Sequence, residues 1–331
     1  MALKPRDKKH KKQIEAGIEG RSRGHEFEEA LAEDINQRDY SKLDFEGTKK
    51  HLVVGRPSDE LIKYILKTEK IREFSNIIAA WYGGLATMNR GNDLPEKAKA
   101  KGSKSDIVIT IMSEKGKKKI GVSVKTCNTK TPTNDQLFCT TASAFCNLLR
   151  DNDIEVSSEA EIALKMFCGE KDFRPLDNPK KVKNRKSDPR RYFWEELPKE
   201  AKDELETLFS VKQKSITRIL LRNAYTDDPI PPDYIFHQRV RCDDIDKCKI
   251  ALFAVDELVQ QSVAHGSFWT SKYRVRKGTY KSDQNTHEAP RFGFIQFQRL
   301  GNKQNATQLQ FNLKAGYFNK LKNLEDSQTK L

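Results

Sequence analysis

Apolar residues recur with a clear period in the first part of the chain. Phe27, Leu31 and Ile35 follow one another at intervals of four, which predicts an amphipathic helix over RGHEFEEALAEDINQ. Glu28 lies beside this apolar stripe. A second helix is predicted to start at Ser58, because this short polar residue is followed by two acidic residues and then by LIKYILK. We predict a third helix in REFSNIIAAW.

Two runs of β-branched residues then predict a β-hairpin in SDIVITIMSEKGKKKIGVSVK. With Lys115 and Gly116 as a two-residue turn, Asp106 lies opposite Lys125. Side chains alternate between the faces of a strand, so the apolar face consists of Ile107, Ile109, Ile111, Ile120, Val122 and Val124. The other face brings Asp106, Ser123 and Lys125 to one end of the hairpin. This acid and amine form either a surface ion pair or part of a chemical site.

The rest of the chain contains both helical and strand patterns. We predict a mostly buried helix in NDQLFCTTASAFCNLLRD, whereas EIALKMFCG fits a core strand or a strand-helix junction. Helices are predicted in KEAKDELETLFS, ITRILLRN and DELVQQSVAHG, and strands in DYIFHQRV, KIALFAV, YRVRKGTY, FGFIQFQRLG and TQLQFNLKAG. Prolines and basic residues over 171–191 predict a linker or exposed loop. We therefore expect a basic flexible tail (1–23), a core (24–170), this linker, and a C-terminal α+β region (192–331).

Charge narrows the class of partner. Lys and Arg number 61 against 47 Asp and Glu, which gives a net charge of +14. Such an excess favours a polyanion, most often nucleic acid. No segment approaches the roughly 18 consecutive apolar residues of a membrane span, and the N-terminus lacks a signal-peptide pattern, so we expect a cytoplasmic protein without membrane contact. The six cysteines do not suggest a disulfide framework, and His237, Cys242 and Cys248 fit no compact zinc motif.

The order of the predicted elements resembles that of the PD-(D/E)XK nuclease superfamily. A helix with a Phe-Glu pair precedes a strand opened by Asp106, a strand ending in Ser-Val-Lys and an apolar helix. The segment Gly24-His25-Glu26-Phe27-Glu28 is similar to the Gly-x-x-Phe-Glu context of that family. By element order, the resemblance covers residues 18–170. It implies an α/β fold with a restriction-endonuclease-like core, which is a mixed β-sheet flanked by helices, and a strand-rich C-terminal elaboration.

The resemblance also implies roles for individual residues. Asp106 would be the main metal ligand, Lys125 the catalytic lysine and Glu28 a further carboxylate ligand. One position departs from the family, because Ser123 stands where an acid or a glutamine is usual. We keep Ser123 as a candidate catalytic residue with three alternatives open. Glu28 supplies the missing charge, a water bridges Ser123 to the metal, or the site is inactive.

The family's chemistry is the hydrolysis of phosphodiester bonds. A hard divalent cation stabilises the charge that develops on the phosphoryl oxygens, so Mg²⁺ is the expected cofactor, with Mn²⁺ as a substitute. The large extra region and the absence of a Walker motif favour a type II restriction endonuclease that cuts double-stranded DNA at a short specific sequence. This function implies a DNA methyltransferase of the same specificity and a possible homodimer. The alternatives are a non-catalytic nucleic-acid-binding protein with a degenerate nuclease fold and a DNA repair nuclease.

Cations and amides outside the core are the candidate DNA contacts. The linker is expected to bind phosphates through Lys180, Lys181, Lys183, Arg185 and Lys186. In the major groove, Arg and Lys pair with guanine and Gln pairs with adenine. Candidates in the strand-rich end are Arg274, Arg276, Lys277, Gln296, Gln298 and Arg299. Gln308 and Gln310 belong to the same group of glutamines, for which a solvated sheet face is the alternative interpretation.

Overall fold

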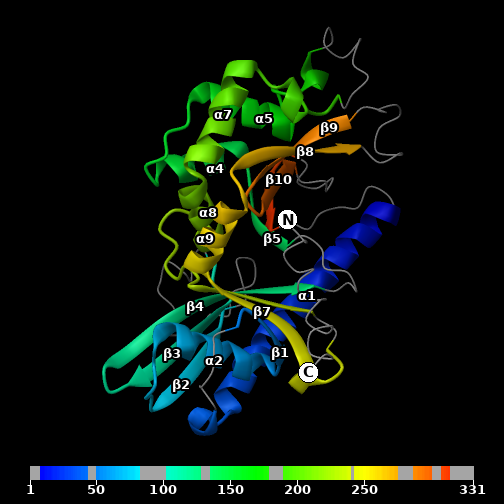
Figure 1. Cartoon of the computed structure of the whole chain (residues 1–331). Coiled ribbons are helices and arrows are strands. Elements are labelled where there is room, and N and C mark those ends of the chain that lie inside the picture. The colour runs from blue at the N-terminus through cyan, green and yellow to red at the C-terminus, as the bar shows by residue number, and fades with distance from the viewer. Residues whose placement is uncertain are drawn as a thin grey trace, which may run out of the picture. The chain divides into compact units, whose positions relative to one another are not determined.

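Figure 1 shows the computed structural model of the protein. The structure describes residues 8–43, 50–82, 102–127, 135–178, 189–239, 242–274, 286–299 and 307–313. The chain divides into two compact units. The first consists of the described parts of Met1–Thr133 and Arg222–Glu257, and the second of the described parts of Asn134–Leu221 and Leu258–Lys314.

A six-stranded mixed sheet forms the first unit, with the strand order β1-β7-β6-β4-β3-β2. The strands are β1 (Leu52–Gly55), β2 (Asn76–Trp81), β3 (Ile107–Ser113), β4 (Gly116–Cys127), β6 (Tyr234–Arg239) and β7 (Cys248–Ala254). Strands β4 and β6 are parallel, and the other neighbours are antiparallel. Apolar residues of α1 (Lys8–Gln37) and α2 (Pro57–Glu69) share one core with the sheet. The predicted α/β class is therefore confirmed.

The hairpin β3–β4 is present, but its predicted register is wrong by two residues. Ser113 pairs with Gly116, and Ile107 pairs with Val122. Asp106 therefore lies next to Ser123 instead of opposite Lys125. A shift by an even number keeps every side chain on its face, and the apolar face is buried as predicted, with Ile107, Ile109, Ile111, Ile120, Val122 and Val124 at most 5% exposed.

Several other predictions need correction. The expected flexible tail is helical from Lys8 onward, because α1 is continuous to Gln37. REFSNIIAAW is not a helix, since Asn76–Trp81 forms β2. In NDQLFCTTASAFCNLLRD, a strand precedes the helix, because Thr141 accepts a hydrogen bond from the Ala144 amide and caps the helix there. EIALKMFCG belongs to a helix that ends at a left-handed glycine, Gly169.

The second unit contains a five-stranded antiparallel sheet in the order β5-β11-β10-β9-β8. Its strands are β5 (Asp135–Thr140), β8 (Phe268–Arg274), β9 (Thr286–Phe292), β10 (Ile295–Arg299) and β11 (Leu309–Leu313). Its helices are α4 (Ala142–Arg150), α5 (Ser158–Cys168), α7 (Lys199–Val211), most of α8 (Gln213–Arg222) and most of α9 (Val255–His265). Aromatic rings in contact fill its core, among them Phe145, Phe209, Phe297 and Phe311.

The expected domain boundaries differ from this division. Strands β6 and β7 follow the segment 171–191, yet they complete the first sheet. A parallel neighbour needs a long connection, and here Asn134–Leu221 lies between β4 and β6. Part of 171–191 forms a short 3-10 turn, Pro175–Asp177.

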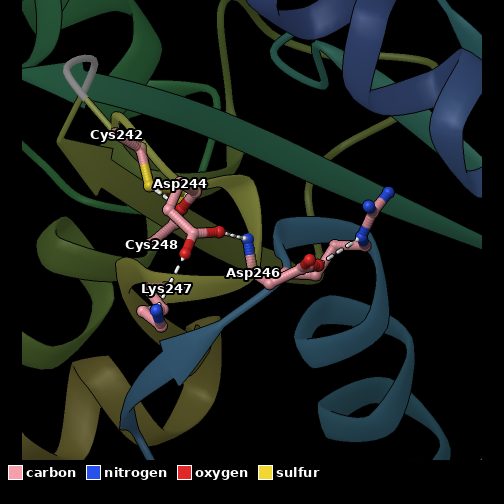
Figure 2. The surroundings of a disulfide bond; sticks show 6 residues. Cys242, Asp244, Asp246, Lys247 and Cys248 are labelled. Carbon is pink, nitrogen blue, oxygen red and sulfur yellow. Dashed lines mark hydrogen bonds and ion pairs between the residues drawn. A yellow bond between two sulfur atoms is a disulfide. The ribbon is translucent and has the colours of Figure 1, made fainter.

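The connection between β6 and β7 contains a disulfide bond that the sequence did not lead us to expect. Cys242 and Cys248 are joined with an S–S distance of 2.16 Å around the 3-10 turn Ile245–Lys247 (Figure 2). Asp246 of this turn forms an ion pair with Arg56. Among the described residues, no helix is long and apolar enough to cross a membrane.

Candidate active site

Asp106 immediately precedes β3, and hydrogen bonds from β4 fix its carboxylate. Its Oδ2 accepts hydrogen bonds from the Val124 amide at 2.6 Å and from the Ser123 hydroxyl at 3.2 Å. The ammonium of Lys125 lies 3.7 Å from the same oxygen. Within the described part of the chain, all of these contacts involve Oδ2. The other oxygen, Oδ1, is therefore available to a ligand.

Ser123 and Lys125 of β4 lie on the same face of the sheet as Asp106, as the alternation of side chains predicts. Ser123 is fully buried, and its hydroxyl points to the carboxylate. Its position is that of a residue that orients Asp106. The Lys125 ammonium also donates to the Val124 carbonyl at 3.1 Å, and its side chain is 22% exposed. The parallel neighbour β6 places His237 beside Lys125 in register.

Glu28 reaches the same end of the sheet from α1. Phe27 stacks on Phe236, and the stripe residues Leu31 and Ile35 are buried, so α1 packs on the sheet with Glu28 directed inward. Trp81, the last residue of β2, donates its indole N–H to Glu28 Oε2 at 3.1 Å. The sequence does not indicate this role of Trp81, because its segment is predicted as a helix.

Electrostatics connect Glu28 with the hairpin. The pKa of Glu28 is raised to about 7, because burial and then the negative charge of Asp106 raise it more than the Trp81 hydrogen bond and the positive charge of Lys125 lower it. Because the charge of Asp106 raises the pKa of Glu28, a cation between the two carboxylates would be favourable. The structure thus brings together three of the predicted residues, Glu28, Asp106 and Lys125.

Lys104 is a second lysine of this site, and the sequence patterns did not single it out. The pKa of Lys104 is lowered to about 7, because burial and then the charge of Lys125 lower it more than Asp106 and Asp228 raise it. The available signal was a lysine two residues before the acid that opens a strand. That signal is weak in a segment with so many lysines.

A buried carboxylate braces the segment that leads into Asp106. Asp228 accepts hydrogen bonds from the Ser103 hydroxyl at 2.6 Å, from the Lys104 amide at 2.8 Å and from the amides of Ala224 and Ile230 at 3.1 Å. These bonds tie the residues before β3 to the residues before β6, although more than 100 positions separate them in sequence.

Gly121 permits the close approach of these segments. A Cβ atom at this position would lie 2.3 Å from the Ser105 hydroxyl and 2.7 Å from the Pro231 carbonyl oxygen. Ser105 itself donates to the Ile230 carbonyl at 2.6 Å. A side chain on Gly121 would therefore displace the backbone next to Asp106.

The donors of the site fit a hard divalent cation. Among the described residues, no group of three or more His, Cys, Asp or Glu side chains is arranged to hold a metal. Mg²⁺ does not require one, because it usually keeps several waters and binds one or two carboxylates together with substrate phosphates. Glu28 and Asp106 supply two such carboxylates, and each has an oxygen outside the hydrogen bonds described above.

The structure describes only some of the candidate DNA-binding residues. Lys180, Lys181, Lys183, Arg185, Lys186, Arg276 and Lys277 lie outside the described residues. Gln296 and Gln298 share one face of the second sheet. Arg299 alternates with Gln298 and so belongs to the opposite face, the face of Phe297. Arg274 is exposed at the end of the edge strand β8.

A comparison with protein-family models gave no match, and no curated protein matches the chain.

Proposed function

We propose that the chain is a magnesium-dependent endonuclease that hydrolyses phosphodiester bonds in double-stranded DNA at a short specific sequence, as type II restriction endonucleases do. One observation carries the proposal: Glu28, Asp106 and Lys125 converge at one end of a mixed sheet. They come from a helix and two adjacent strands, in the order that the resemblance to PD-(D/E)XK nucleases implies. The restriction-endonuclease-like core is part of this proposal.

Each residue of the site has a role in the proposed reaction. Asp106 and Glu28 hold Mg²⁺, which stabilises the negative charge that develops on the phosphoryl oxygens. Lys125 holds a positive charge beside the scissile phosphate and orients the attacking water. Ser123 and the Val124 amide keep Asp106 in place, and Trp81 does the same for Glu28. Ser123 is thus a positioning residue, and Glu28 supplies the second negative charge.

The proposed substrate also implies partners for the protein. The net charge of +14 suits a DNA polyanion. One active site cuts one strand, so double-strand cleavage by a homodimer is part of the proposal. A restriction enzyme in the cytoplasm also requires a DNA methyltransferase of the same specificity to protect the host DNA.

The second candidate is a non-catalytic nucleic-acid-binding protein. The observation that favours it is Ser123, which removes one carboxylate from the expected ligand set. Such a protein would bind DNA and release no product.

Cleavage of unmethylated plasmid, followed by mapping of the ends, tests the proposal. Activity should require Mg²⁺ or Mn²⁺, and Ca²⁺ should support binding with little cleavage, because its looser coordination positions the reacting groups poorly. Asp106→Ala and Lys125→Ala should each abolish cleavage but not folding. Lys117→Ala, an exposed lysine of the same hairpin, is the matched control and should cut normally. Full activity in excess EDTA, or in either site variant, would refute the mechanism.

A further inference from the structure

A row of four glutamines crosses three adjacent strands of the second sheet. Gln296 and Gln298 lie on β10, Gln310 on β11 and Gln136 on β5. The Nε2 of Gln296 donates to Oε1 of Gln298 at 3.3 Å, the Nε2 of Gln298 to Oε1 of Gln310 at 3.2 Å, and the Nε2 of Gln310 to Oε1 of Gln136 at 2.9 Å. All three hydrogen bonds of the four-glutamine row therefore run in the same direction, from Gln296 to Gln136, and each amide orients the next.

The row lies on the face of the sheet that faces away from the aromatic core. Phe297 and Phe311 alternate with the glutamines and are fully buried. Gln296, Gln298 and Gln310 are partly exposed, and Gln136 is exposed. The amides are thus held in place by one another and still reach the surface.

The two central amides keep hydrogen-bonding capacity for a ligand. A glutamine amide has two N–H donors and an oxygen with two lone pairs. Among the described residues, Gln298 and Gln310 each use one N–H and one lone pair within the row. Each therefore retains one donor beside one acceptor. Adenine presents the complementary pair in the major groove, with N7 as acceptor and the N6 amino group as donor.

A cation extends the row on the neighbouring strand. Arg291 of β9 pairs in register with Gln296. Its guanidinium lies 5.1 Å from the centre of the Trp269 ring, and its Nε donates to the Ser271 hydroxyl at 2.8 Å. The positive charge complements a polyanion. The guanidinium covers one face of the Trp269 ring, so an unpaired base cannot stack on that face.

The size of the row also suits a duplex. Neighbouring strands are spaced about 4.8 Å apart, so amides on β10, β11 and β5 occupy a strip about 10 Å wide. The major groove of B-DNA is about 12 Å wide and admits a two-stranded β-ribbon. An unpaired strand would instead require open aromatic faces.

We propose that the four-glutamine row reads adenine in the major groove of duplex DNA, so that the recognition sequence contains A·T pairs at the positions facing Gln298 and Gln310. The proposal rests on the proposed function for its DNA substrate, but not on cleavage. It can therefore be tested on the catalytically inactive Lys125→Ala chain.

The test is a selection of binding sites from a random duplex library with Lys125→Ala in the presence of Ca²⁺. Enriched duplexes should share at least one adenine position. Replacement of that adenine by 7-deazaadenine, which lacks the N7 acceptor, should weaken binding about 10- to 100-fold by fluorescence anisotropy. In the Lys125→Ala background, Gln298→Met or Gln310→Met should cause a similar loss and abolish the effect of 7-deazaadenine, with unchanged affinity for random duplex.

Gln308→Met is the matched control, because Gln308 accepts a hydrogen bond from the Cys139 thiol and is not a member of the row. It should leave affinity and sequence preference unchanged, and thermal unfolding of all variants verifies that they are folded. Selected sites without A·T pairs, a preference for single strands, or an equal loss on random duplex would overturn the proposal. The plasmid assay with the wild-type chain separately decides whether the protein is a nuclease.

Discussion

The two sheets of this protein differ in the side chains that they carry outside their cores. In the first sheet, Glu28, Asp106 and Lys125 gather charge of both signs at one end. In the second sheet, the row that contains Gln298 and Gln310 has hydrogen-bonding groups but no charge. Charged groups can bind a metal ion and stabilise developing charge, whereas neutral amides can distinguish patterns of donors and acceptors. The comparison favours separate places for chemistry and for recognition.

The largest expected effect concerns the charge of Glu28. Glu28→Gln keeps the size of the side chain and an oxygen for the Trp81 hydrogen bond, but removes a metal-binding charge. Single-turnover cleavage should fall about 1000-fold and require more Mg²⁺, since a bound metal contributes several kcal/mol. Ser123→Ala should cost less than about 10-fold, because it removes one neutral hydrogen bond. If Ser123→Ala were inactive and Glu28→Gln normal, the assignment of charge to Glu28 would be wrong.

The same Glu28→Gln substitution should increase stability at high pH. The pKa of Glu28 is about 7 in the folded chain, against 4.5 for an ordinary glutamate. Between these values the unfolded chain loses its proton first, so the stability of the wild type falls as pH rises. The full penalty, about 3 kcal/mol, applies above pH 7. Urea unfolding at pH 4 and pH 8 should show a stabilising effect of the substitution that grows with pH, and a gain equal at both would contradict the burial of this carboxylate.

A smaller effect is expected from Asp228, the brace of the first unit. Asp228→Ala leaves buried donors without an acceptor and should cost about 2 kcal/mol of folding free energy. Asp228→Asn keeps one acceptor oxygen and should cost less. Amide hydrogen exchange should become faster at Lys104, Ala224 and Ile230, whose amides donate to Asp228, while strands β9 to β11 of the second unit keep their rates. An equal increase of the exchange rates in both units would show that Asp228 does not act locally.

The smallest effect is expected for DNA binding when an exposed cation of the second unit is removed. Arg274 is exposed at the end of β8, and Arg274→Ala should reduce the slope of log affinity against log salt by about 0.9 if it contacts one phosphate. The selected sequence should not change. Loss of the five linker cations should reduce the slope further, and an unchanged slope in both variants would place the phosphate contacts elsewhere. The linker cations are Lys180, Lys181, Lys183, Arg185 and Lys186.

Parts of the structure with a strong local pattern were predictable. The six β-branched residues of the hairpin predicted one buried face. This prediction is confirmed although the predicted register was wrong by two residues, because an even shift leaves each side chain on its face. The stripe of Phe27, Leu31 and Ile35 predicted the helix that directs Glu28. The hairpin pattern thus placed Asp106 and Lys125 at one end of the sheet, and the resemblance to the PD-(D/E)XK nucleases added Glu28 to them.

Other parts depended on contacts between distant residues. NIIAAW carries no helical period, and its pairing with β3 makes it a strand. Trp81, Lys104 and Asp228 became site residues only through partners far away in sequence. The glutamines of β10 and β11 were recognised as a group, but the link from Gln310 to Gln136 required the strand order of the sheet.

The parallel pairing of β4 with β6 has a consequence for protein synthesis. His237 pairs with Lys125 and follows it by 112 residues, and ribosomes add about 5–20 residues per second. About 6 to 20 s therefore pass between the synthesis of Lys125 and that of its neighbour on β6. Until then, β4 of the nascent chain has one unpaired edge, which can pair with other chains. The charged end of the sheet is therefore complete only after this delay, and a chain that is truncated before β6 is expected to aggregate.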